Sequence, residues 1–352
     1  MSSNHAIVIQ GAGKAQVVEA SVPKLRDDYL IVKVVAVALN PTDVAHIDLF
    51  AVTGARVGCD YAGIVEEVGS KVTKAFKKGD RVAGVAHGSN AVYHEDGTFA
   101  EFITVKGDLQ IRIPDNVSFE EAATLGVSVT TVGQSLYQSL GLPYFDKPST
   151  EKLPVLIYGG STATGALAIQ YAKLSGLHVI TTASPHNFEY LKKLGADVIL
   201  DYRSETVVED IKKSAGGQLK HALDCISSES SANISVKAIA EDGGNYSSLR
   251  AVSAELVSAI NSHVTPKVTL AYTALGEPFQ FGPKALPAIP ADLEFGSKFW
   301  SDTERLLEEG KVVAHKATVN EGGSGLEGVL KGLDLVRQGK VSGTKLVYTL
   351  SQ

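Results

Sequence analysis

The feature that most constrains this chain is a regular alternation of short apolar runs with helical patterns in its second half. The apolar runs lie at 154–158, 179–183, 198–202, 222–226 and 245–249. Helical patterns follow the first four runs, at 163–175, 186–194, 205–215 and 230–240. Strands that alternate with helices in this way form βαβ units. The sequence therefore predicts an α/β fold with a doubly wound parallel sheet and helices on both of its faces.

A glycine-rich turn joins the first predicted strand to the first helix. At this place in a βαβ unit, the amides and the dipole of a helix N-terminus bind the pyrophosphate of a dinucleotide. Against the pattern G-x-G-x-x-G, the middle glycine is replaced by Thr162. A plain glycine turn without a ligand is the alternative. The residues that we expect to contact the cofactor here are Gly160, Ser161, Thr162, Ala163, Thr164 and Gly165.

The residues after the second and third strands favour NADPH over NADH. An NAD site usually has an acidic residue after the second strand, which accepts from the ribose 2′-hydroxyl. Here that strand is followed by Ser184 and Asn187, and no carboxylate lies between them. Tyr202 and Arg203, after the third strand, add two more donors for a 2′-phosphate. Helix capping is the alternative role for Ser184 and Asn187.

The first third of the chain is predicted to be rich in β-strands and to form a second, barrel-like domain. Strands are expected at 6–10, 29–39, 62–68 and 81–85, and a last one at 345–350. Helical patterns begin at Ser118, which has a capping-box partner in Glu121, and return at 301–309 and 326–337. The segment 276–290 contains four prolines and no confident element. We therefore expect residues 1–130 and 295–352 to form a β-rich substrate domain, with the NADPH-binding domain, 131–294, inserted between its halves.

Charge and segment composition exclude several classes of partner. The net charge of −6 and the lack of a basic run argue against nucleic acid and anionic lipid. No apolar stretch is long enough to span a membrane, and the N-terminus lacks the pattern of a signal peptide. Two cysteines, Cys59 and Cys225, cannot build a disulfide framework, which favours a reduced, cytoplasmic compartment.

The same cysteine count argues against zinc. A structural Cys₄ site is impossible, and no second thiolate lies near Cys59, so we expect no metal. A ligand set of Cys59 and Asp60 with His46 or His87 is the alternative. Without a Lewis acid, polarising an alcohol or aldehyde is difficult, whereas an activated C=C bond can be reduced because its own carbonyl accepts the charge.

Several motifs resemble a known family. They include Asn40-Pro41-Thr42-Asp43, Gly58-Cys59-Asp60-Tyr61-Ala62-Gly63 and Lys78-Gly79-Asp80-Arg81-Val82, of which the last is shared by the whole family. The chain is similar to the zinc-free medium-chain dehydrogenases/reductases and, through the motifs at 159–164, 184–188, 222–226 and 342–347, to fungal trans-acting enoyl reductases of polyketide pathways. The resemblance implies a Rossmann domain inserted in a GroES-like domain, with a cleft between the two. It also implies NADPH-dependent reduction of an α,β-unsaturated acyl thioester on the carrier of a polyketide synthase.

The resemblance also implies roles for further residues. It places Thr42, Asp43, Val44 and Ala45 on the nicotinamide side, and Thr131 at a contact with substrate and cofactor. It adds cofactor contacts at Leu249, Arg250, Val341 and Ser342. One departure is Ala45, which stands where the lovastatin-type members of this family carry a lysine, and His46 follows it. His46 as a substitute for that lysine and His46 as a structural residue both remain open.

The proton donor and the exact substrate also remain open. Thr131, His46 and Tyr61 are the candidates for the catalytic proton transfer. The alternatives to a carrier-bound acyl substrate are a small molecule for a stand-alone quinone, enone or aldehyde reductase, or a nucleotide-binding protein without catalysis. The oligomeric state is expected to be a monomer or a homodimer.

Overall fold

The computed structural model describes residues 4–350, which fall into two compact units. The first unit combines residues up to 130 with those from 272 onward, and the second contains 131–271. The segment 272–294, which we expected in the second unit, therefore packs with the first. Within residues 4–350, no helix is both long and apolar enough to cross a bilayer.

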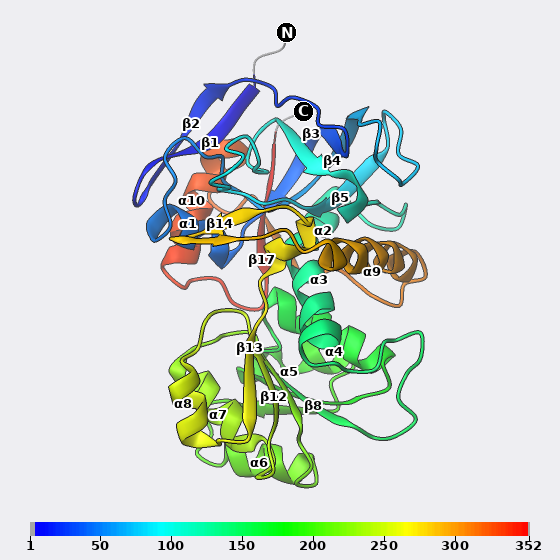
Figure 1. Cartoon of the computed structure of the whole chain (residues 1–352), viewed down its shortest axis with the longest axis vertical. Helices are drawn as coiled ribbons and strands as arrows, with labels where there is room; N and C mark the ends of the chain where they lie inside the picture. Colours follow the sequence, from blue (N-terminus) through cyan, green and yellow to red (C-terminus); the bar gives the residue numbers. More distant parts are fainter. Residues whose placement is uncertain (1–3, 351–352) are drawn as a thin grey trace. The chain divides into compact units, whose positions relative to one another are not determined.

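The second unit is built on a six-stranded parallel sheet, with the strand order β10-β9-β8-β11-β12-β13 (Figure 1). Its strands are β8 (Pro154–Tyr158), β9 (His178–Ala183), β10 (Val198–Asp201), β11 (His221–Asp224), β12 (Gly244–Ser248) and β13 (Val264–Val268). Its helices are α4 (Ala163–Leu174), α5 (Phe188–Lys193), α6 (Val207–Ser214), α7 (Glu229–Ala238) and α8 (Ala254–Ile260). This order is the doubly wound arrangement of dinucleotide-binding domains, which confirms the predicted fold class. Sequence reasoning missed β13, an edge strand that is mostly exposed and contains Pro266.

The first unit is built on a seven-stranded, largely antiparallel sheet. Its strands are β3 (Tyr29–Ala38), β4 (Asp60–Val68), β5 (Arg81–Val85), β6 (Phe102–Lys106), β7 (Gln110–Arg112), β16 (Ala317–Val319) and β17 (Lys345–Thr349). A separate hairpin contains β1 (Asn4–Gly11) and β2 (Lys14–Ala20). The last strand, β17, pairs antiparallel with β3, with Val347 opposite Ala38. The C-terminal strand thus rejoins the first domain, as expected, and the parallel-sheet unit is an insertion.

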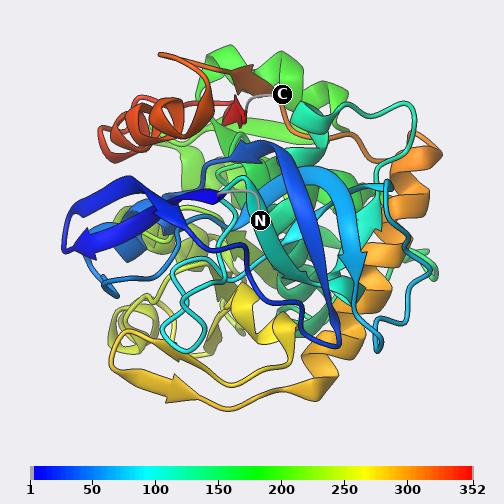
Figure 2. The same cartoon turned by 90° about the horizontal axis from the view of Figure 1, so that it is seen from above.

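Helices of the first unit cover this sheet and its edges. They are α1 (Pro41–Asp48), α2 (Phe119–Ala123), α3 (Gly126–Gly133, which crosses into the second unit), α9 (Pro290–Glu308) and α10 (Gly325–Arg337). The capping box at α2 is formed, because Ser118 Oγ accepts from the amide of Glu121 at 3.1 Å. Helix α9, seen as the long helix of Figure 2, begins at Pro290 rather than at residue 301. A proline at the first helical position needs no amide partner, so the proline-rich stretch leads directly into the helix.

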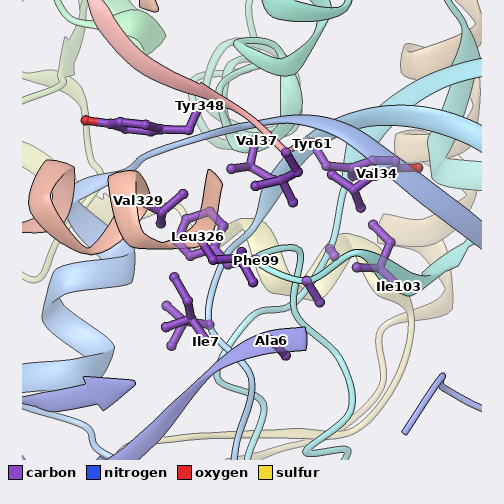
Figure 3. Packing of buried hydrophobic residues seen from close by; sticks show 14 of the residues in the cluster. Ala6, Ile7, Val34, Val37, Tyr61, Phe99, Ile103, Leu326, Val329 and Tyr348 are labelled. Atoms are coloured by element: carbon purple, nitrogen blue, oxygen red, sulfur yellow. The ribbon is translucent and has the colours of Figure 1, made fainter. Parts of the chain in front are cut away.

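The core of the first unit joins segments from both halves of the chain. Ile7 of β1 and Phe99 share one buried cluster with Leu326 and Val329 of α10, as Figure 3 shows. Tyr348 of β17 belongs to the same cluster. Residues after the inserted unit therefore complete the hydrophobic core that the first third of the chain begins.

A buried ion pair ties the last strand to the sheet. Lys345 Nζ donates to Asp60 Oδ2, and the two residues are 4% and 0% exposed. The other carboxylate oxygen of Asp60 accepts the amide of Val127 at 2.7 Å. A Cβ at Gly126 would lie 2.3 Å from that oxygen, so only glycine fits at the start of α3. The pair thus connects β4, β17 and α3.

We expect Lys345→Met to lower the free energy of unfolding by about 3–5 kcal/mol, because it leaves the buried Asp60 without its cation. The matched control is Lys71→Met, which breaks an exposed ion pair with Asp27 and should change stability little. Urea denaturation of both variants and the wild type measures the difference. Equal stability of the two variants would contradict the role assigned to the buried pair.

Candidate functional site

The glycine turn after β8 is shaped by close contacts with β9. Gly159 has a φ of +81°, which favours glycine. A Cβ at Gly160 would lie 2.1 Å from Thr181 Oγ1, and the amide of Gly160 donates to Thr182 O at 3.0 Å. A Cβ at Gly165 would lie 2.4 Å from Gly159 O. The structure thus gives Gly160 a packing role, and its amide is already bonded within the protein.

The N-terminus of α4 lies directly after this turn. Thr162 is the N-cap: its Oγ1 accepts the amide of Gly165 at 3.0 Å and donates to Gly159 O at 2.8 Å. The first amides of a helix have no intrahelical acceptor. Ser161, Ala163 and Thr164 surround this end and are half-buried. The absence of side chains at the glycines and the positive end of the helix dipole fit an anionic group such as a pyrophosphate.

A buried carboxylate, Asp224, organises the neighbouring turn at the end of β11. Its Oδ1 accepts the amides of Ile226 and Ser227, each at 2.9 Å, and its Oδ2 accepts the hydroxyls of Ser231 and Tyr246, each at 2.7 Å. Four donors satisfy this charge without a cation. A Cβ at Gly159 would lie 2.9 Å from the side chain of Ile226, so Asp224 positions a wall of the glycine turn. Sequence reasoning did not single out Asp224. An aspartate at the end of a predicted buried strand is the sequence signal that indicates a residue of this kind.

Leu249 and Arg250 follow β12 and contact the same turn. Their amides donate to Ser227 Oγ at 2.9 and 3.2 Å. The guanidinium of Arg250 donates to Ile226 O at 2.6 Å. The structure therefore brings both predicted cofactor contacts to the end of β11, within the second unit.

The residues predicted for a 2′-phosphate follow β9 and β10, two adjacent strands. Neither Ser184 nor Asn187 caps a helix through its side chain. The amide group of Asn187 contacts His186 Nε2 at 3.1 Å. Arg203 is bound to the carboxylate of Asp201 by two hydrogen bonds of 3.0 and 3.1 Å. The sequence did not indicate this local pairing, in which the guanidinium already has an anionic partner.

In the first unit, α1 brings Thr42 and His46 onto one helical turn. His46 Nδ1 lies 2.8 Å from Thr42 O and 3.2 Å from Thr42 Oγ1. Tyr272, which no sequence motif indicated, places its Oη 2.9 Å from Thr42 Oγ1 and 3.7 Å from Cys59 Sγ. Asn40 and Pro41 begin the helix, and Asp43 Oδ2 accepts the amide of Asn40 at 2.7 Å.

Aromatic side chains surround this helical turn. The ring of His46 has edge contacts with Phe50, Tyr272 and Phe281, at centroid distances of 5.9, 5.7 and 5.7 Å. His87 stacks on Tyr272 at 4.0 Å. Burial lowers the pKa of His46, and burial lowers the pKa of His87 to about 3. Both imidazoles are therefore neutral at pH 7, and His46 does not supply the charge that a lysine at position 45 would carry.

Buried acidic groups lie on α1 and next to it. Burial raises the pKa of Asp43 to about 7, and the charge of Asp60 acts in the same direction. Burial and the charges of Asp43 and Asp60 raise the pKa of the Cys59 thiol well above its usual value. Among residues 4–350, no three His, Cys, Asp or Glu side chains are arranged to hold a metal ion.

The remaining predicted residues lie on several different elements. The Tyr61 hydroxyl donates to Gln110 Oε1 at 2.8 Å in the sheet core, so the structure does not bring it to Thr42. Thr131 is buried within α3 and is the first residue of the second unit. Val44 and Ala45 lie on α1, while Val341 and Ser342 lie between α10 and β17.

Two family models match the chain. One, described as an alcohol dehydrogenase GroES-like domain, matches residues 26–115, and one described as a zinc-binding dehydrogenase matches 163–280. The trans-enoyl reductase TOXD of Cochliobolus carbonum is 52% identical over 300 residues, which cover 85% of this chain and 99% of the relative. The chain belongs to the trans-enoyl reductase family. A second member, ACTTS2 of Alternaria alternata, is 45% identical and covers 99% of this chain, with 100% of its own length matched.

Solved structures support the same fold for this oxidoreductase. The structure of CurK enoyl reductase matches it with a TM-score of 0.77, 20% identity, 99% coverage of this chain and 100% of that one. The expected combination of a GroES-like domain with an inserted Rossmann domain is confirmed. Although one matching model is described as zinc-binding, the described residues offer no fitting set of ligands, as shown above.

The depressed pKa of His87 predicts a dependence of stability on pH. Between pH 6.5 and 3 the unfolded state binds a proton at His87 that the folded state does not. The free energy of unfolding should therefore fall as the pH drops below 6.5, by up to about 1.4 kcal/mol per pH unit for this one proton. His87→Phe, which keeps a ring against Tyr272, should remove this contribution.

The measurement is urea denaturation of wild type and variant at several values between pH 7 and 4. The difference between the two proteins isolates His87 from the other titrating groups. The exposed His94, substituted by Phe, is the control and should keep the wild-type dependence. Parallel curves for wild type and His87→Phe would show that His87 is not held neutral.

Proposed function

We propose that this protein catalyses the NADPH-dependent reduction of an activated C=C bond in an α,β-unsaturated acyl thioester. The observation that carries the proposal is its identity of 52% with a trans-enoyl reductase, across 99% of the length of that relative. The motifs described above point to the same class. An acyl group on the carrier of a separate polyketide synthase is the proposed substrate, and the cytoplasm, where Cys59 and Cys225 stay reduced, is the proposed compartment.

The second unit supplies a fitting site for the dinucleotide. We assign the pyrophosphate to the N-terminus of α4, where Ser161, Ala163 and Thr164 lie, since the first turn of a helix offers amides and the glycines place no side chain in the way. We assign the 2′-phosphate to Ser184 and Asn187, whose side chains do not cap the helices that follow. The bound nicotinamide supplies the hydride.

The first unit supplies polar groups for the reacting end of the substrate. We assign Thr42 to this end, beside the neutral His46 on the same helical turn. Hydride addition at the β-carbon leaves negative charge on the thioester oxygen, which a fixed hydroxyl donor stabilises. The α-carbon then takes a proton from water.

A stand-alone quinone, enone or aldehyde reductase is the second candidate. The specific observation in its favour is Ala45, together with the neutral state of His46. A carrier-bound substrate arrives on a phosphopantetheine arm, whose phosphate a cation would attract. The two candidates differ in substrate and share the cofactor.

We expect NADPH to bind at least tenfold more tightly than NADH, which corresponds to about 1.4 kcal/mol. Ser184→Asp should abolish this preference, since a carboxylate repels the 2′-phosphate and accepts from a 2′-hydroxyl. Fluorescence titration gives both dissociation constants. Ser258→Asp, an exposed substitution on α8, is the charge-matched control and should keep the preference. Equal affinities of the wild type for the two cofactors would refute the assignment.

We expect specificity constants for crotonyl- and 2-methylenoyl-pantetheine thioesters to exceed those for quinones and aldehydes. NADPH consumption across such a panel measures them. Ala45→Lys should raise the thioester activity if the missing cation limits it. Rapid reduction of quinones or aldehydes without detectable thioester reduction would assign the enzyme to the stand-alone class.

A further inference from the structure

Tyr272 brings a hydroxyl from a distant part of the chain onto α1. It lies in a short 3₁₀ helix, Ala271–Leu275, and stands 230 residues after Thr42, which it contacts at 2.9 Å. Tyr272 is 4% exposed, whereas Thr42 is half-buried. Thr42 is therefore the member of this pair that can also reach a ligand.

The proton of His46 determines where the Thr42 hydroxyl can donate. A carbonyl oxygen only accepts, so the 2.8 Å contact between His46 Nδ1 and Thr42 O requires a proton on Nδ1. The same N–H group faces Thr42 Oγ1 at 3.2 Å. A protonated Nδ1 has no lone pair, so the Thr42 hydroxyl does not donate to His46.

Tyr272 is the second neighbour to which the Thr42 hydroxyl could donate within the protein. Burial raises the pKa of its phenol well above the usual value, so the phenol keeps its proton. Its two neighbouring acceptors are Thr42 Oγ1 at 2.9 Å and Cys59 Sγ at 3.7 Å. The hydroxyl oxygen is the closer and stronger acceptor. The geometry allows either hydroxyl to donate in the contact between Tyr272 and Thr42. We infer that Tyr272 is the donor, because Thr42 Oγ1 is its nearer acceptor, and the proton of Thr42 is then left for an acceptor outside the protein.

We propose that Tyr272 is a positioning residue, which makes the Thr42 hydroxyl an outward hydrogen-bond donor to the carbonyl oxygen of the substrate. This inference rests on the proposed function, in which that oxygen gains negative charge as hydride reaches the β-carbon. Thr42 contacts the reacting group, and Tyr272 acts through Thr42. A hydroxyl that accepts one hydrogen bond becomes a stronger donor of the next. Neither residue loses its proton, because the α-carbon is protonated by water.

Packing and charge hold Tyr272 in this place independently of its hydroxyl. Its ring stacks on His87 at 4.0 Å. Five residues further along, Glu277 accepts from Tyr29 Oη at 2.8 Å and from Lys106 Nζ at 2.9 Å. These contacts fix the segment to β3 and β6. Tyr272→Phe should therefore remove the hydroxyl and leave the ring in position.

The test is a double-mutant cycle in the full-length enzyme. With crotonyl-pantetheine, Tyr272→Phe should lower kcat about tenfold and leave the dissociation constant of NADPH unchanged, while Thr42→Val should lower kcat by ~10²-fold. In the Thr42→Val background, Tyr272→Phe should have no further effect, whereas in Thr42→Ser it should keep its effect. The control is Tyr348→Phe, another buried tyrosine with one hydroxyl bond, to Glu321 O at 2.9 Å, which should leave kcat unchanged.

Unchanged activity of Tyr272→Phe, or equal losses in the wild-type and Thr42→Val backgrounds, would overturn the proposal. If the wild type reduces quinones and no thioesters, the proposed substrate class is wrong. The same double-mutant cycle with a quinone as substrate then still tests the role of Tyr272, because a quinone oxygen also gains negative charge during reduction. Neutron diffraction from deuterated crystals gives an answer independent of activity. A deuteron on Tyr272 Oη directed at Thr42 supports the inference, and one on Thr42 Oγ1 directed at Tyr272 refutes it.

Discussion

The buried pair of Asp60 and Lys345 is the interaction on which the first unit depends most. Lys345 is contributed by the last strand and Asp60 by the first residue of β4, so the pair closes a unit that the inserted sheet interrupts. A buried carboxylate without its cation is costly, so the return of the C-terminal strand contributes strongly to the stability of this unit. The same carboxylate accepts the amide of Val127 and so fixes where α3 starts.

Burial around this pair also sets the electrostatic character of α1. Asp43 and Cys59 lie in the same low-dielectric region, and both have raised pKa values as a result. The aromatic rings of Phe50 and Phe281 contact His46, and burial lowers the pKa of its imidazole. The face that we assign to the substrate therefore carries a hydroxyl and a neutral imidazole. This differs from the lysine-bearing helix that the motif-based resemblance implies for its relatives.

Periodicity in the sequence was sufficient to predict the parallel sheet and its connections to helices. Buried parallel strands such as β8 are continuous apolar runs, and the glycine turn that follows has few conformational alternatives. Short or partly exposed elements were missed, among them α1, which has only a weak apolar face, and the hairpin of β14 (Phe279–Phe281) and β15 (Lys284–Leu286). The hairpin lies within the proline-rich segment 276–290, which shows no regular alternation. Its position depends on side chains distant in sequence, such as Tyr29 and Lys106 through Glu277.

By itself, the sequence determined the fold class, the place of the glycine turn between the first strand and helix of the parallel sheet, and the lack of an acidic residue after the second strand. These features are local, because spacing, glycine and strand ends depend on neighbouring residues. Only the tertiary structure decided which side chains meet at α1 and in which protonation state. Tyr272 contacts Thr42, which lies 230 residues earlier in the chain. Arg203 donates to Asp201, and Tyr61 donates to Gln110 in the core. Contacts of this kind follow from packing and burial, which no pattern along the chain encodes.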